Sequence, residues 1–300
     1  MEASRKGGED MAGKTRWPAV LLLVAVAALV LPSRGVDSPK TEPEPLAAAV
    51  EAATDLPPAE SAAKEEPAVE EVLPPEPPKP AEPVPETPVV ADTYFDGAVF
   101  FGDSRTDGFR LYSGLGRGSY YFATGATVES VFTKSMETKE GKELPPLLDQ
   151  LAQIETPPER IFVMLGVNEL GWAKSENFHD YYVQLIERLR QDHPQAEILI
   201  QSILPVSKLQ EEKKTYVNNT RIAKYNEIIR QVCGETGAPF LDVASAVVDE
   251  EGFLRSDWTY DGVHLNKKGC AAWLDYLRTH AVNYEVYAPA EGPSAAEETT

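Results

Sequence analysis

The stretch Ala98-Val-Phe-Phe-Gly-Asp-Ser-Arg-Thr-Asp-Gly108 contains an apolar run, then a glycine, then a polar segment. Four consecutive apolar residues are typical of a strand that is buried on both faces. Gly102 ends the run, and the polar residues after it suit the start of a helix. The stretch therefore predicts a buried strand that leads into a helix, with Ser104 at the junction.

Four later apolar runs also predict buried strands, at residues 120–123, 161–165, 197–204 and 240–243. Apolar residues at three- and four-residue steps predict helices between and after them, at residues 143–154, 177–191, 214–236 and 267–282. Strands of continuous apolar character that alternate with amphipathic helices indicate a parallel sheet covered on both faces. We therefore expect an α/β domain, a three-layer α/β/α sandwich around a central parallel sheet.

Three glycines stand at the ends of expected strands. Gly102 follows the first strand, Gly125 comes shortly after the second, and Gly166 follows the third. In open parallel sheets, functional sites form at the carboxyl ends of the strands. The chemistry is therefore expected among the residues that surround these glycines.

Two polar residues at these strand ends are candidates for the site. Ser104 would expose its hydroxyl at a strand end, although Asp103-Ser104 could equally cap a helix. Asn168 in Gly166-Val-Asn could direct its amide into the same crevice, or could serve as an ordinary turn residue. Neither residue settles the function by itself.

Near the carboxyl terminus, Asp261-Gly-Val-His264 places a carboxylate three residues before a histidine. In a tight turn the carboxylate can hold one imidazole nitrogen and leave the other to face a serine. Nucleophilic catalysis requires this pairing of a base with a group that orients it. A plain surface histidine is the alternative, but the other three histidines lie in helical segments or at their ends, without such a partner.

The order of these motifs resembles the SGNH subgroup of the GDSL esterases and lipases. Gly-Asp-Ser comes first, then a glycine, then Gly-x-Asn, and finally Asp-x-x-His, and the resemblance spans about Val99 to Trp273. It implies an α/β/α fold and hydrolysis of an ester through an acyl-enzyme, with no metal or cofactor.

The resemblance also implies a role for each matching residue. Ser104 would be the nucleophile, His264 the general base and Asp261 the residue that orients His264. The oxyanion hole would comprise the backbone N–H groups of Ser104 and Gly125 together with the side-chain amide of Asn168. Three preorganised donors would stabilise the negative charge that develops on the ester oxygen.

The sequence departs from the family pattern at two places. Glu169 stands where the third motif usually has aspartate, and Phe122-Ala-Thr-Gly125 lacks the asparagine that usually precedes this glycine. Other glycines nearby could replace Gly125 in the oxyanion hole, namely Gly114, Gly116 and Gly118. Arg105, next to the serine, could bind an anionic substrate group, but we favour a solvated helix position for it.

Outside this domain the composition changes. Residues 36–92 hold 14 of the 25 prolines and a large excess of carboxylates, which predicts a disordered linker before a domain at residues 93–284 and an acidic tail at 285–300. The linker supplies roughly half of the net charge of -20. An acidic chain without a basic stripe argues against nucleic acid as a partner.

The first 35 residues carry the features of an export segment. Lys14 and Arg16 precede an apolar run at residues 18–32, an arrangement that orients the following chain out of the cytoplasm. The run is long for a signal-peptide core and short for a membrane span. We expect an uncleaved anchor that holds the domain outside the membrane, with a cleaved signal peptide and a secreted protein as the alternative.

Two cysteines, Cys233 and Cys270, lie in helical patterns and are expected to be buried thiols rather than a disulfide. The expected substrate is a small acyl ester, such as an O-acetyl group of an envelope glycan. Transfer of the acyl group to a sugar hydroxyl is the alternative among enzymes. A binding module that retains the fold without turnover is the alternative outside them.

Overall fold

The computed structural model describes residues 78–137 and 141–283. Its centre is a parallel sheet of five strands in the order β2-β1-β5-β6-β7. The strands are β1 (Ala98–Gly102), β2 (Ser119–Phe122), β5 (Arg160–Met164), β6 (Glu197–Gln201) and β7 (Phe240–Leu241). The expected parallel sheet is therefore confirmed, with each strand within or close to its apolar run.

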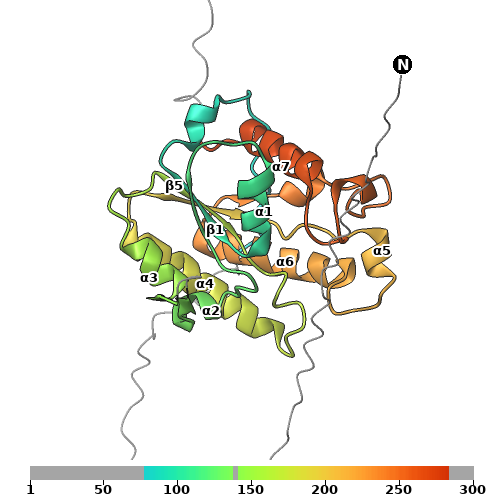
Figure 1. The fold of residues 1–300 in the computed structure, drawn as a ribbon, viewed down its shortest axis with the longest axis horizontal. Helices are drawn as coiled ribbons and strands as arrows, with labels where there is room; N and C mark the ends of the chain where they lie inside the picture. Colours follow the sequence, from blue (N-terminus) through green and yellow to red (C-terminus); the bar gives the residue numbers. More distant parts are fainter. Residues whose placement is uncertain (1–77, 138–140, 284–300) are drawn as a thin grey trace, which may run out of the picture. The chain divides into compact units, whose positions relative to one another are not determined.

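Helices cover both faces of the sheet (Figure 1). One hydrophobic cluster joins the sheet to α3 (Leu147–Ala152), α4 (Ser175–Asp192) and α6 (Asn219–Thr236). A second cluster on the opposite face joins it to α1 (Ser104–Tyr112) and α7 (Lys267–Thr279). The shorter elements are α2 (Ser130–Thr133), α5 (Lys208–Glu211), β3 (Met136–Glu137), β4 (Glu143–Leu144), η1 (Asp92–Phe95), η2 (Val243–Ala246) and η3 (Ser256–Trp258). The three-layer α/β/α sandwich is confirmed.

The strand order reverses between β1 and β5, and we call the space outside the carboxyl ends of these two strands the crevice. The chain leaves β1 for β2 on one side and then crosses to β5 on the other, so β1 pairs with both. Ligands of doubly wound sheets bind outside the carboxyl ends of the strands at such a reversal. Ser104, the first residue of α1, and Asn168, in the loop after β5, lie at this point.

Gly102 is required by the close approach of β1 to its neighbours. A Cβ atom there would lie 2.3 Å from the carbonyl oxygen of Met164 and 2.4 Å from Oγ1 of Thr106. Helix α1 begins two residues later, and the side chain of Asp103 caps it by accepting the N–H of Arg105 at 2.8 Å. This tight junction fixes the first residue of the helix, Ser104, at the edge of the crevice.

Two helices start later than their sequence periodicity predicts. The helix expected from residue 143 begins at Leu147, because Glu143–Leu144 forms the antiparallel strand β4 and two prolines follow it. The helix expected from residue 214 begins at Asn219, because the Asn218 side chain caps it by accepting the N–H of Arg221. Local capping and pairing therefore override the apolar spacing at both sites.

The boundary expected between residues 92 and 93 is wrong for residues 78–92, because this segment packs on the domain. The N–H groups of Ala81, Val84, Thr87 and Val90 donate to carbonyl oxygens of α6, β7 and α7. Pro83 forms a parallel bridge with Phe240 at the edge of the sheet. Proline is tolerated at an edge because the missing N–H would face solvent there. The rest of the predicted linker, residues 36–77, and the predicted tail lie outside the described residues.

Cys233 and Cys270 are free and buried, as expected. They belong to the hydrophobic clusters on opposite faces of the sheet, so the sheet separates them.

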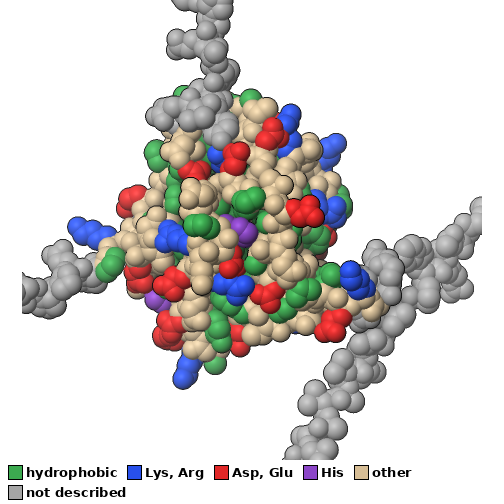
Figure 2. All heavy atoms as spheres, turned by 90° about the vertical axis from the view of Figure 1, so that its left-hand side faces the viewer, with side chains coloured by type: hydrophobic (Ala, Val, Ile, Leu, Met, Phe, Trp, Pro, Cys, Tyr) green, Lys and Arg blue, Asp and Glu red, His purple; other side chains and the backbone are tan. Residues whose placement is uncertain are grey.

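Within the described ranges, no helix is both long and apolar enough to cross a membrane. The apolar run at residues 18–32 lies outside those ranges. Figure 2 shows acidic and basic side chains interspersed over one face of the domain.

Shortening the chain tests the new boundary. A chain that begins at residue 78 should be as stable as the full chain, since it keeps every described contact. A chain that begins at residue 93 loses the four backbone hydrogen bonds that residues 78–92 donate to α6, β7 and α7, each worth about 0.5–1.5 kcal/mol, and should be less stable by about 2–6 kcal/mol. Urea unfolding of both chains measures the difference. Equal stability of the two would show that residues 78–92 contribute nothing to the fold.

Candidate active site

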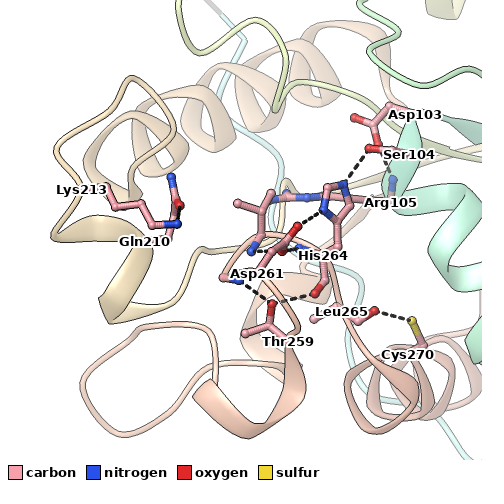
Figure 3. Close-up of polar contacts among 12 residues, drawn as sticks. Asp103, Ser104, Arg105, Gln210, Lys213, Thr259, Asp261, His264, Leu265 and Cys270 are labelled. Carbon is pink, nitrogen blue, oxygen red and sulfur yellow. Dashed lines mark hydrogen bonds and ion pairs between the residues drawn. The ribbon is translucent and has the colours of Figure 1, made fainter. Parts of the chain in front are cut away.

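Three residues singled out from the sequence meet at one end of the sheet. Oγ of Ser104 lies 2.9 Å from Nε2 of His264. The other ring nitrogen of His264, Nδ1, lies 2.7 Å from Oδ2 of Asp261. Figure 3 shows the resulting line of two hydrogen bonds from the start of α1 to the loop before α7. This geometry allows the imidazole to take a proton from the hydroxyl while the carboxylate holds the ring.

The loop that carries His264 is held by its own polar groups. Oδ1 of Asp261 accepts the N–H groups of Val263 and His264, each at 2.8 Å. Oγ1 of Thr259 donates to the carbonyl oxygen of His264 at 2.7 Å and accepts the N–H of Gly262. The backbone of His264 and the orientation of its ring are therefore fixed by neighbours within five residues.

The same bonds set the charge of Asp261. Partial burial acts to raise the pKa of this carboxyl, but the N–H and imidazole groups of His264 and the N–H of Val263 outweigh it and lower the pKa to about 2. Asp261 is therefore ionised at neutral pH. An ionised carboxylate holds the proton of His264 on Nδ1 and leaves Nε2 to accept from Ser104.

Asn168 joins the two sides of the crevice. Its Nδ2 group donates to the carbonyl oxygen of Ala126 at 2.8 Å and to Oδ2 of Asp103 at 3.3 Å. The expected position near the serine is thus observed, because Asp103 immediately precedes Ser104. Both amide hydrogens are engaged, and the bond to Asp103 is the longer of the two.

Gly125 lies in the turn that follows β2. The turn closes with the N–H of Ala126 bonded to the carbonyl oxygen of Ala123 at 3.0 Å. Gly125 has φ +74°, which favours glycine, although a Cβ would meet nothing within 4 Å. Since Asn168 bonds to the next residue, Ala126, this turn borders the crevice. The alternative glycines at 114, 116 and 118 all precede β2 and therefore lie toward the amino ends of the strands, away from Ser104.

A cavity of about 260 Å³ lies beside Gly125. Buried side chains of Ala126, Val131 and Leu147 contribute to its wall. The remaining lining residues are Ala123, Thr124, Ser130, Lys134, Ser135 and Met136. Every lining residue falls within residues 123–147, so the cavity lies on the Gly125 side of the site and not within the loop that carries His264.

Arg105 differs from both expectations for it. Its side chain is only 3% exposed, so it is neither a solvated helix residue nor a group that reaches out to substrate. Nη1 donates to the carbonyl oxygen of Leu204 at 2.9 Å. Burial lowers the pKa of the guanidinium to about 10, against the opposing effect of the charges on Asp103 and Asp261. Arg105 is therefore a buried cation beneath the site.

Two buried acids were not recognised from the sequence as parts of the site framework. Asp103 is 1% exposed, and Glu169 is fully buried with its Oε1 accepting the N–H of Val128 at 2.7 Å. The sequence position of these acids could have indicated their role, since each is a charged residue next to a motif at the end of a strand. A charged side chain is ordinarily expected to be exposed to solvent, so the sequence did not predict that these two are buried.

A doubly wound sheet with a serine, a histidine and an aspartate in line at its switch point defines an ester-hydrolysing enzyme of the α/β/α class. The sequence model of the GDSL-like Lipase/Acylhydrolase family matches residues 100–272, which is more than half of the chain. The protein belongs to this family.

Solved structures to which the chain is similar share little sequence with it. A Streptococcus pneumonia protein described provisionally as a platelet activating factor is 22% identical, with 61% of this chain and 82% of that one covered at a TM-score of 0.50. A GDSL-like lipase from Bacteroides thetaiotaomicron is 17% identical, with 63% and 86% covered at 0.44. An acetyl xylan esterase is 16% identical, with 60% and 96% covered at 0.42. No curated protein matches the sequence.

The ionisation of Asp261 predicts how acid affects stability. The pKa of about 2 in the folded protein lies below the ordinary value of 3.8, so the folded state favours the carboxylate. This contribution to the free energy of unfolding is present above pH 3.8 and is lost as pH falls toward 2. The Asp261→Asn variant should therefore lose less stability than the wild type between pH 4 and pH 2. Equal losses in chemical unfolding at these pH values would contradict the assignment.

Proposed function

We propose that the protein is a serine ester hydrolase that works through an acyl-enzyme. The line of hydrogen bonds from Ser104 through His264 to Asp261 carries this proposal. His264 takes the hydroxyl proton as Oγ of Ser104 attacks the ester carbonyl, and then gives it to the leaving alcohol oxygen as that bond breaks. Water next attacks the acyl-enzyme with His264 as base, which releases the acid and restores the serine.

The oxyanion hole is proposed to comprise the backbone N–H groups of Ser104 and Gly125 and the amide of Asn168. The first N–H groups of a helix have no partner within the helix, and Ser104 begins α1. The longer bond of the Asn168 amide, at 3.3 Å to Asp103, is the one whose hydrogen the oxyanion would share. The hole is thus assembled from the ends of β1, β2 and β5.

The acyl group is proposed to occupy the cavity beside Gly125. His264 must reach the oxygen of the leaving group to protonate it, so the leaving alcohol lies on the side of the 259–264 loop. The cavity lies on the other side, with its lining within residues 123–147. Its wall of Ala126, Val131 and Leu147 suits the apolar part of an acyl group.

The site of action is proposed to lie outside the cytoplasm. Support comes from Lys14 and Arg16 ahead of the apolar run at residues 18–32, the pattern of an anchor or an export signal. Ester-bearing molecules available there include acylated glycans of the cell envelope. We therefore propose small acyl esters of envelope glycans, such as O-acetyl groups, as the substrate class, with the protein attached to the membrane by its first 35 residues.

A substrate screen of the purified protein tests this function. The wild type should hydrolyse p-nitrophenyl esters of short acyl chains and release acetate from acetylated polysaccharides. Ser104→Ala should lose both activities and should no longer react with a fluorophosphonate, because it lacks the oxygen that attacks the ester carbonyl or the phosphorus atom. Product analysis with an added sugar acceptor separates hydrolysis from acyl transfer. Full activity in Ser104→Ala would refute the proposal.

Asn168 gives a sharper test of the oxyanion hole. Asn168→Ala removes one donor and should lower kcat by about 10²–10³ with little change in KM. Some stability should also be lost, since the amide bonds both Ala126 and Asp103. Slow labelling by a fluorophosphonate should persist, which would show that the nucleophile is still in place. A variant that keeps more than about a third of the wild-type kcat would exclude Asn168 from the hole.

A further inference from the structure

The carboxyl group of Glu169 is enclosed at the end of β5, directly after Asn168. Its side chain has no exposed surface. Oε1 accepts the N–H of Val128 at 2.7 Å, and Oε2 has no hydrogen-bond partner among the described residues. The proposed reaction does not use this group, although a fully buried acid beside an active site is costly to maintain.

Asn168 and Glu169 hold one loop at two points. Asn168 donates to the carbonyl oxygen of Ala126, and Glu169 accepts the N–H of Val128. The segment between β2 and α2 that includes these two loop residues also carries Gly125. The two bonds therefore attach this segment to the end of β5 at Ala126 and at Val128, which are separated by one residue.

We propose that Glu169 is a positioning residue for the oxyanion hole, because its bond to Val128 holds the loop that presents the N–H of Gly125. This inference rests on the proposed function, in which Gly125 donates to the oxyanion. Glu169 does not touch the substrate. It acts through the loop.

The charge state of Glu169 matters for the same reason. Burial raises its pKa to about 8, the N–H of Val128 opposes this, and the charge on Asp103 adds to the rise. Tyr182 from α4 and Tyr225 from α6 also face the group, and no described side chain forms an ion pair with it. At neutral pH the acid is protonated, so it accepts the N–H without placing a negative charge near the developing oxyanion.

Ionisation of Glu169 should therefore produce an alkaline loss of activity. Above about pH 8 the carboxylate would repel the oxyanion and raise the barrier. The pKa of the tyrosine beside it, Tyr182, lies well above its ordinary value, and that of Arg105 is about 10. Burial also raises the pKa of Asp103, a second buried acid near Ser104. The limb is therefore assigned to Glu169 by its loss in Glu169→Gln.

Two variants of the full chain separate the bond from the charge. Glu169→Gln keeps an oxygen acceptor for Val128 and cannot ionise. It should retain kcat/KM within about twofold at pH 7 and should lack the limb near pH 8. Glu169→Leu has a similar size but no acceptor, and should lower kcat at least about tenfold with KM little changed.

A stability measurement checks the charge without using activity. In the folded state the pKa of about 8 exceeds the ordinary 4.5, so the stability linked to protonation is full below pH 4.5 and is lost as pH rises through 8. Glu169→Gln lacks this loss, and should gain stability relative to the wild type between pH 5 and pH 8. This readout remains useful if Glu169→Leu fails to fold.

Glu211 provides a matched control. Its Oε2 accepts the backbone N–H of Asn219 at 2.7 Å, between α5 and α6. Glu211→Leu removes the same kind of bond, and should lower stability while leaving kcat and the alkaline limb unchanged. An equal loss of kcat in Glu211→Leu would show that any such bond matters only for folding, and would overturn the inference.

Other results would also overturn it. A wild-type profile that is flat to about pH 9.5, an alkaline limb retained in Glu169→Gln, or wild-type kcat in Glu169→Leu would each do so. So would Glu169→Gln as inactive as the leucine variant, since the carboxylate itself would then be needed. These outcomes can be read only if the wild type hydrolyses esters and Ser104→Ala does not. If that activity is absent, the proposed function itself has failed.

Discussion

The hydrogen bond between Ser104 and His264 joins residues 160 positions apart in the chain, and it depends on how α7 docks against the sheet. Phe109 of α1 packs on Trp273 of α7 with ring centroids 4.5 Å apart. The indole N–H of Trp273 also donates to Oε1 of Gln201 on β6 at 2.7 Å. Displacement of α7 by about 1 Å would be enough to lose the reactive geometry. The buried aromatic core therefore sets the alignment of the two groups.

Three ionisable residues lie buried below this bond, at the end where β1 and β5 separate. Asp103 caps α1 and holds Asn168, Glu169 holds the loop beyond β2, and Arg105 reaches the carbonyl oxygen of Leu204. Nε and Nη2 of Arg105 have no partner among the described residues. Burial of polar groups with incomplete pairing lowers the stability of a fold. Part of this cost falls where positions near the serine must be fixed.

Much of this could be predicted from the sequence. The strands could be found because each is a continuous apolar run, and Ser104, Asp261 and His264 could be found because their roles depend on motif and spacing. The burial of Arg105 and Glu169 could not be predicted, because a charged side chain is expected in solvent unless the tertiary contacts are known. Residues 78–92 were expected to be linker because proline-rich, acidic sequence suits an extended solvated chain. The same extended backbone also fits the edge of a sheet, and composition does not distinguish the two.

The docking of residues 78–92 has a consequence for the behaviour of the protein at high concentration. β7 is the last strand of the sheet, and an uncovered last strand offers unpaired N–H and C=O groups to the sheets of other molecules. Pro83 and Val84 occupy this position beside Phe240. A segment rich in proline donates few hydrogen bonds of its own, so it closes the edge without offering a new one. Pro83 and Val84 thereby occupy the edge of β7 at which the sheet of another molecule could otherwise pair.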